Sequence, residues 1–109
     1  MDRRFWIADG RRADFEVAFR LGGTWTKLLH EADGYLATEV WCENPGTRQY
    51  RVRDLWTWHR NFENFRSRFQ SEYERFENWL ASEGLIEKQK FLGAYYEKEP
   101  GDEDELVPG

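Results

Sequence analysis

Few side chains in this sequence are of the types that perform acid–base chemistry near neutral pH. The 109 residues include two histidines and one cysteine. His59 follows Trp58 at the point where a strand is expected to lead into a helix, which places an imidazole and an indole together at the rim of a candidate pocket. Because the unperturbed pKa of histidine is close to neutrality, His59 is the candidate general acid or base. The alternative is a polar, hydrogen-bonding residue at that rim.

Other reactive residue types lack the spacing of a recognisable site. His30 lies in the segment His30-Glu31-Ala32-Asp33, but adjacent ligands at a helix end point in different directions, so no metal site is predicted. Cys42 has no histidine or basic cluster near it in sequence, which argues against a reactive thiolate. No phosphate-binding loop, dinucleotide fingerprint or nucleophile elbow is present. We therefore expect no bound cofactor.

Two carboxylates fall within expected strands. Asp54 alternates with Tyr50 and Trp56 on one face of its strand, whereas Arg53 points to the opposite face. A carboxylate among aromatic rings needs a partner, because an unpaired buried charge is costly. We therefore predict that Asp54, and likewise Glu39, forms an ion pair at a subunit interface.

The elements that position these residues follow from turn signals and from hydrophobic periodicity. Strands are predicted at residues 3–8, 35–41, 49–56 and 91–96, with 85–90 as a connector, and helices at 12–19, 25–32 and 60–82. The strongest signal belongs to the last helix, whose aromatic and leucine positions recur every three or four residues and form one apolar face. That face consists of Phe62, Phe65, Phe69, Tyr73, Phe76 and Leu80.

The order β-α-β-β-α-β predicts an α+β, ferredoxin-like fold with a four-stranded antiparallel sheet and helices on one face. Strand parity places apolar side chains on both faces of the sheet. An uncovered face that carries Tyr and Trp is larger than the apolar patch a monomer usually exposes. We therefore predict a two-fold homodimer in which two sheets face each other.

Composition limits the classes of protein that fit. Aromatic residues make up 17% of the chain, which is too many for a disordered polypeptide. Residues 97–109 carry the whole net charge of −5, so we predict a domain at residues 1–96 and an acidic, disordered tail at 97–109. The neutral domain argues against nucleic-acid binding. Short apolar runs and the absence of an apolar leader in MDRRFWIADG argue against a membrane span and a signal peptide, so a cytoplasmic protein is expected.

Several short motifs, in this order and spacing, resemble the antibiotic-biosynthesis-monooxygenase-like domains of the dimeric α/β-barrel superfamily. The resemblance covers residues 3–96 and rests on Gly23-Thr24-Trp25, Gly34-Tyr35-Leu36-Ala37-Thr38-Glu39, Tyr50-Arg51-Val52-Arg53-Asp54-Leu55-Trp56, the segment 62–65 and Phe91-Leu92-Gly93. It implies a dimer whose subunits each hold a pocket between sheet and helices. Several members of that family oxidise flat aromatic molecules with dioxygen and without a bound metal or flavin.

The resemblance suggests a cofactor-independent monooxygenase-like protein that acts on a flat aromatic or polyketide-like molecule. Its candidate residues are His59 as base, and Trp25, Trp56, Trp58 and Phe65 as substrate-binding walls. The alternatives are a non-catalytic dimer that binds an apolar small molecule and a purely structural homodimer. Haem degradation does not fit, because the asparagine, tryptophan and histidine of the haem-degrading relatives have no counterpart here; Phe65 and Arg75 stand at the two helical positions.

Overall fold

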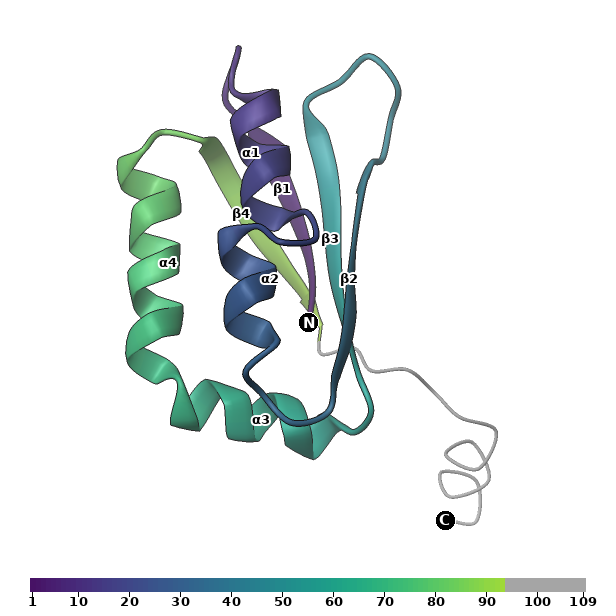
Figure 1. The fold of residues 1–109 in the computed structure, drawn as a ribbon. Helices are drawn as coiled ribbons and strands as arrows, with labels where there is room; N and C mark the ends of the chain where they lie inside the picture. Colours follow the sequence, from purple (N-terminus) through teal and green to yellow (C-terminus); the bar gives the residue numbers. More distant parts are fainter. Residues whose placement is uncertain (94–109) are drawn as a thin grey trace.

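Four strands form one antiparallel sheet in the order β2-β3-β1-β4, and helices precede and follow the central hairpin. The computed structural model describes residues 1–93 (Figure 1). The elements are β1 (Asp2–Ile7), α1 (Arg12–Phe19), α2 (Thr24–Leu29), β2 (Tyr35–Cys42), β3 (Gln49–Trp56), α3 (His59–Arg68), α4 (Gln70–Ser82) and β4 (Ile86–Gly93). This α+β arrangement is compatible with the predicted ferredoxin-like fold. None of the helices in the described residues is long and apolar enough to cross a membrane.

The central hairpin follows from its turn residues. Pro45 and Gly46 stand between β2 and β3, and Gly46 has a φ of 86°, a conformation that glycine adopts without steric cost. The backbone N–H and the hydroxyl of Thr47 both donate to the carbonyl of Asn44, which closes the turn. The predicted hairpin is therefore confirmed, and its register places Val40 opposite Val52.

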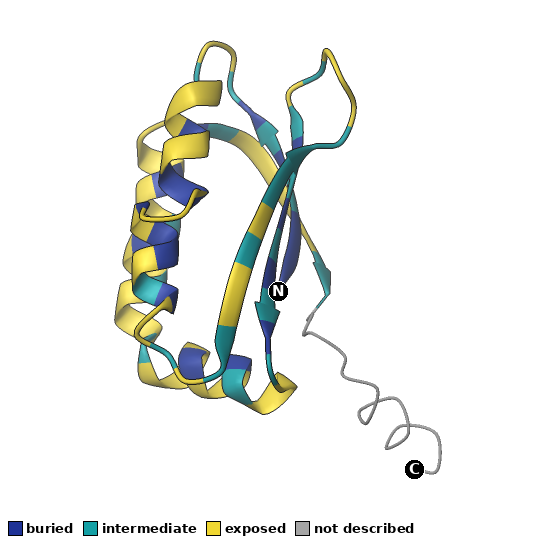
Figure 2. Ribbon diagram, turned by 45° about the vertical axis from the view of Figure 1, so that its right-hand side comes forward, coloured by how far each residue is buried: buried dark blue, intermediate teal, exposed yellow. Residues whose placement is uncertain are grey.

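Strand β3 separates the two faces of the sheet. Tyr50, Val52, Asp54 and Trp56 are buried, while the residues between them are only partly buried. The helices lie on one side of the sheet (Figure 2), and the burial of this set indicates that it faces them. No helix of the described residues lies on the other side, which we call the uncovered face. Its side chains come from Asp2, Arg4, Trp6, Glu39, Trp41, Glu43, Arg51, Arg53, Leu55, Lys88 and Lys90.

The predicted helix at residues 60–82 is in fact two helices that meet at Phe69, whose φ and ψ of −109° and 31° are not helical. Figure 1 shows the chain turning sharply there, with no Gly or Pro at the break. A single helix over residues 59–82 would be about 36 Å long, whereas the eight-residue strands β3 and β4 span about 27 Å. Because of the bend, Phe65 packs on Trp56 while Phe76 packs on Trp25.

The last strand begins earlier than predicted. Residues 86–90, interpreted as a connector, form the first part of β4, where Ile86 pairs with Ile7 and Lys88 with Trp6. Among the strands of residues 1–93, β4 pairs only with β1 and is therefore an edge strand. Edge strands commonly carry charged side chains, and these obscured the alternation with a period of two in the sequence. Residues 94–96 of the predicted strand and the predicted tail at 97–109 lie outside the described residues.

The core between the sheet and the helices consists mainly of aromatic rings. Ring centroids of neighbouring members lie between 4.8 and 6.2 Å apart, in edge-on or tilted contacts that suit the ring quadrupole. We call this set the ring cluster: Phe5, Phe15, Phe19, Trp25, Trp56, Phe65 and Phe76. The cluster joins β1 and β3 to α1, α2, α3 and α4.

Candidate functional site

A buried carboxylate lies inside this aromatic core. Asp54 is fully buried, and its Oδ1 accepts hydrogen bonds from Trp25 Nε1 at 2.8 Å and from Thr38 Oγ1 at 2.7 Å. Since the Thr38 hydroxyl donates to Asp54, the Tyr35 hydroxyl, 2.7 Å away, donates to Thr38. Asp54 Oδ2 has no hydrogen-bond partner in the described residues. Hydrogen bonds therefore link Tyr35, Thr38, Asp54 and Trp25 in that order, and one oxygen of Asp54 is left as an unused acceptor.

Burial is the main influence on the Asp54 carboxyl. It raises the pKa of Asp54 above the usual value of 3.8, because the charged form is poorly solvated. The positive charges of Arg3 and of the Met1 amino group oppose this shift. That amino group donates to the Asp54 carbonyl at 3.0 Å, and its own burial lowers its pKa to about 6.

Arg3 is a second buried ionisable group in the same layer. Its guanidinium donates to Glu77 on α4 at 2.8 Å and lies 4.9 Å from the ring centres of both Phe5 and Trp25. Cation–π contact and one ion pair thus offset part of the cost of burying this charge. The sequence placed Arg3 in a strand but gave no sign that its charge would face the core.

Three of the predicted substrate-binding residues are brought together. Trp25, Trp56 and Phe65 belong to the ring cluster, where the Phe65 ring centre lies 6.2 Å from that of Trp25 and 5.5 Å from that of Trp56. All three are buried. They form a continuous aromatic wall beside Asp54.

Trp58 and His59 are not part of that wall. Trp58 is 47% exposed and precedes α3, and the His59 side chain is 49% exposed at the first position of the helix. His59 Nε2 lies 3.4 Å from a carboxylate oxygen of Glu63, one turn along α3. The structure thus places His59, the predicted base, on the outer surface beside Trp58, whereas Trp25, Trp56 and Phe65 are buried.

The prediction that Asp54 forms an interface ion pair was wrong about its surroundings. Asp54 faces the helices, not the uncovered face through which two sheets could meet. Strand parity correctly separated Asp54 from Arg53, but parity does not indicate which side the helices cover. Glu39 does lie on the uncovered face, 3.9 Å from Arg53 of the same chain.

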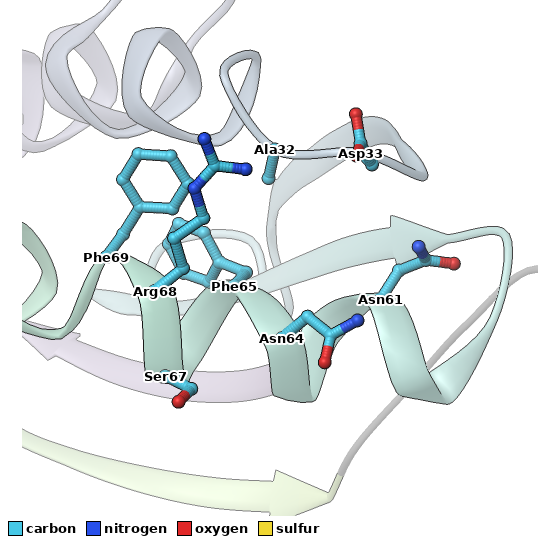
Figure 3. A pocket seen from close by; sticks show the side chains of 8 residues that line it. All are labelled: Ala32, Asp33, Asn61, Asn64, Phe65, Ser67, Arg68 and Phe69. Carbon is cyan, nitrogen blue, oxygen red and sulfur yellow. The ribbon is translucent and has the colours of Figure 1, made fainter.

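A surface pocket opens beside Phe65, the member of the ring cluster that belongs to α3. This depression of about 370 Å³, the α3 pocket, lies between the turn after α2 and one side of α3 (Figure 3). Figure 3 shows Asn61 and Arg68 extending from the helix toward the turn. Its lining residues are Ala32, Asp33, Asn61, Asn64, Phe65, Ser67, Arg68 and Phe69.

Local sequence explains why the turn and the helix meet here. Gly34 has a φ of 85°, and a Cβ at this position would lie 2.4 Å from the side chain of Asn61. Both the backbone N–H and the hydroxyl of Thr57 donate to the Gly34 carbonyl, which ties the turn to the start of α3. Glycine is required for both the conformation and the close approach.

The α3 pocket combines aromatic surface with hydrogen-bonding groups. The rings of Phe65 and Phe69 are stacked at 5.6 Å, and the guanidinium of Arg68 lies 5.5 Å from the ring centre of Phe69. Sequence reasoning found Phe65 but missed Asn61 and Asn64. The available signal was the spacing of Asn61, Asn64 and Arg68 at i, i+3 and i+7, which places them on one helix side.

Three depressions lined by residues of the described range 1–93 do not lie between the sheet and the helices, where the family resemblance implies a pocket. The α3 pocket and a groove between α2 and α4 have no lining residue from the sheet, and a third depression beside the β2–β3 hairpin has none from the helices. The ring cluster occupies the intervening space. Within residues 1–93, no cluster of three or more His, Cys, Asp or Glu side chains could hold a metal ion.

Comparison of the chain with protein-family models, with curated proteins and with solved structures gave no match.

Proposed function

We propose that this protein binds a flat aromatic or polyketide-like molecule in the α3 pocket. The observation that carries the proposal is the position of Phe65. Its ring lines the pocket and also contacts Trp25 and Trp56, so the predicted aromatic wall extends to the inner side of the pocket. Phe69 adds a second ring face beside it.

The polar groups of the pocket suit oxygen substituents on such a ligand. Asn61 and Asn64 offer amide donors and acceptors, and Arg68 offers donors of fixed geometry. Phenol and ketone oxygens in the plane of a ring system can meet these groups while the ring lies against Phe69. The volume of about 370 Å³ falls in the range of small-molecule sites, roughly 300–1,000 Å³.

Binding of anthrone, under nitrogen, and of anthraquinone tests this proposal. Isothermal titration should show one site per chain, with affinity reduced about tenfold or more in Phe69→Ala and Asn64→Ala because each removes a direct contact. Ser71→Ala, on the exposed start of α4, is the matched control. Equal affinities in all four proteins would show that the α3 pocket is not the site.

We also propose that two copies pair through the uncovered face. This face is less apolar than predicted: Tyr50 and Trp56 point to the helices, and the Trp41 ring lies under the guanidinium groups of Arg51 and Arg53. Its charges are nonetheless asymmetric, since the edge strand β2 carries Glu39, with Glu43 directly after its end, and the edge strand β4 carries Lys88 and Lys90. A two-fold axis parallel to the strands would place β2 of each copy over β4 of the other.

In such a dimer, the acidic edge of each copy meets the basic edge of the other. This contact occurs twice, because each residue contact of a two-fold interface is repeated. Sedimentation velocity should therefore show a dimer for the wild type and a monomer for Lys88→Glu/Lys90→Glu. Adding Glu39→Lys, at a side chain that is 52% exposed, to that variant should strengthen the association again. A wild-type protein that stays monomeric at high concentration and low salt would disprove the pairing.

A second candidate function, cofactor-free oxygenation, is favoured by the Asp54 carboxylate. Burial raises its pKa, which makes the ionised form a stronger base, and its Oδ2 is an unused acceptor in the described residues. In the proposed reaction, a ring CH₂ group that is conjugated with a ring ketone through the aromatic system loses a proton to Asp54, and the carbanion transfers electrons to dioxygen. The CH₂ group and O₂ then yield C=O and H₂O. Substrate would reach Asp54 by displacing the Phe65 ring.

Turnover of anthrone with and without air tests the assignment of the base. Asp54→Asn should reduce the oxygen-dependent rate by about 100-fold or more, whereas His59→Ala should leave it unchanged. Thr38→Val is the second variant, because loss of its hydrogen bond should move the pH profile of turnover to higher pH. A loss confined to His59→Ala would assign the base to His59 instead.

A further inference from the structure

A second depression lies on the outer side of the helices, away from the α3 pocket. This space of about 570 Å³, the α2–α4 groove, is bounded by α2 on one side and α4 on the other. Its apolar part consists of Leu28, Phe76 and Trp79. Phe76 is buried and lies 5.7 Å, centre to centre, from the Trp79 ring, which remains 37% exposed. An exposed indole beside a buried phenyl ring offers a surface on which a planar ligand can stack.

The two helices run in opposite directions, which fixes the order of side chains along the groove. Figure 1 shows α2 leading toward the turn before β2, while α4 leads back from the break at Phe69. The contact between Trp25 and Phe76, at 5.0 Å, sets the register. Residues near the start of α2 therefore face the end of α4, and residues after α2 face the start of α4.

This register brings like charges to the same level of the groove. Lys27 and Arg75 lie at the middle level, beside Leu28 and Phe76, and Glu31 and Glu72 lie one turn further, toward the break between α3 and α4. Within residues 1–93, no salt bridge or side-chain hydrogen bond involves any of these four side chains. Paired cations attract a carboxylate, and paired carboxylates attract an ammonium group.

From one end to the other, the groove therefore presents an aromatic surface, two cations and two anions. An aromatic α-amino acid has these features in the complementary order: a ring, then a carboxylate and an ammonium group on one carbon. We infer that the α2–α4 groove is a binding site for an aromatic α-amino acid, with its ring on Trp79, its carboxylate between Lys27 and Arg75, and its ammonium group between Glu31 and Glu72. This site is separate from the α3 pocket.

Three indole compounds test the inference directly, because each of two analogues lacks one charged group of L-tryptophan. L-Tryptophan carries both charged groups, tryptamine lacks the carboxylate and indole-3-propionate lacks the ammonium group. Titration of the full chain should shift the indole N–H resonance of Trp79 in ¹H–¹⁵N spectra, assigned from its loss in Trp79→Phe. L-Tryptophan should bind at least about tenfold more tightly than either analogue, since each analogue loses a charge-assisted contact.

Charge-neutral variants then assign each contact. Arg75→Gln should abolish the preference for L-tryptophan over tryptamine, and Glu72→Gln should abolish the preference over indole-3-propionate. Arg20→Gln and Glu74→Gln are matched controls, because both residues are exposed and neither lines the groove. Asn64→Ala, in the α3 pocket, should leave all three affinities unchanged.

Several outcomes would overturn the inference. They are the absence of a saturable shift of Trp79 with L-tryptophan, equal affinities for the three indoles, and variant affinities that match those of the controls. Loss of L-tryptophan binding in Asn64→Ala would place the ligand in the α3 pocket instead. Because no arm of the test depends on anthrone binding, failure here leaves the proposed function to be judged by its own experiments.

Discussion

The two faces of the sheet shift the pKa of a carboxyl group in opposite directions. Asp54 points toward the helices, where burial among rings raises its pKa. Glu43 lies on the uncovered face, where the hydrogen-bonded guanidinium of Arg4 is the largest influence and, with Gln49 and Arg51, lowers its pKa to about 2. The same sheet therefore holds one carboxyl group that resists ionisation and one that resists protonation.

This difference shows which face can perform acid–base chemistry. On the uncovered face, each carboxylate of Asp2, Glu39 and Glu43 has an arginine partner in the same chain, and an arginine partner favours the charged form of a carboxylate. On the helix-facing side, Asp54 has two neutral donors and one unused oxygen. A carboxylate with spare acceptor capacity and a raised pKa is better suited to take a proton from a ligand than one held by arginine.

The largest expected effect compares one tryptophan from each face. Trp25→Ala removes a fully buried ring that packs on four aromatic neighbours and donates to Asp54, so it should lower the free energy of unfolding by about 3–5 kcal/mol. Trp41→Ala, on the uncovered face, should lower it by less than about 1 kcal/mol, since that ring mainly loses cation–π contacts. Urea denaturation at matched oligomeric state measures both. Comparable losses would mean that the uncovered face is as important to stability as the core.

A smaller effect should appear in the pH dependence of stability of Asp54→Asn. The folded state holds the Asp54 proton more tightly than the unfolded chain, in which the pKa is near 3.8. The stability that this carboxyl contributes is therefore present below pH 3.8 and is lost as the pH rises through its folded pKa. The melting temperature of Asp54→Asn, relative to wild type, should rise with pH across this window.

Glu43→Gln should show the opposite dependence. Its folded pKa of about 2 lies below the ordinary value of 4.5, so Glu43 contributes stability above pH 4.5 and loses it as the pH falls toward 2. The wild type should therefore exceed Glu43→Gln in melting temperature at neutral pH and match it near pH 2. Pairwise scans from pH 2 to 8 test both variants, and pH profiles of the same sign would contradict the contrast between the faces.

The sequence predicted most of the fold because alternation and turn chemistry are local. Parity along β3 separated Asp54 from Arg53, and the turn at Gly46 defined the hairpin. The break at Phe69 was missed because a continuous apolar stripe fits two bent helices as well as one straight helix. The early start of β4 was missed because charged side chains on an edge strand hide its period.

The candidate site was predicted only in part, for a physical reason. Side chains that form the core are recognisable in a sequence by apolar periodicity, so Trp25, Trp56 and Phe65 were predicted. A surface pocket arises where distant elements meet, and here it depends on Gly34 lying against Asn61. A residue pattern within one helix or strand does not predict contacts between distant elements. His59 was chosen for its pKa, a property of the isolated residue, and the structure places it away from the α3 pocket.

The smallest expected effect comes from Tyr50, a second acidic group on the helix-facing side. Its hydroxyl donates to Glu16 on α1, and burial together with that carboxylate raises the pKa of Tyr50 to about 12. The stability that this phenol contributes is present below pH 10 and is lost as the pH rises toward 12. Tyr50→Phe should cost about 1 kcal/mol at neutral pH, and this difference from wild type should disappear between pH 10 and 12. Because Tyr50 and Asp54 both favour their neutral forms, a persistent difference at pH 12 would show that burial on this face does not act on both groups alike.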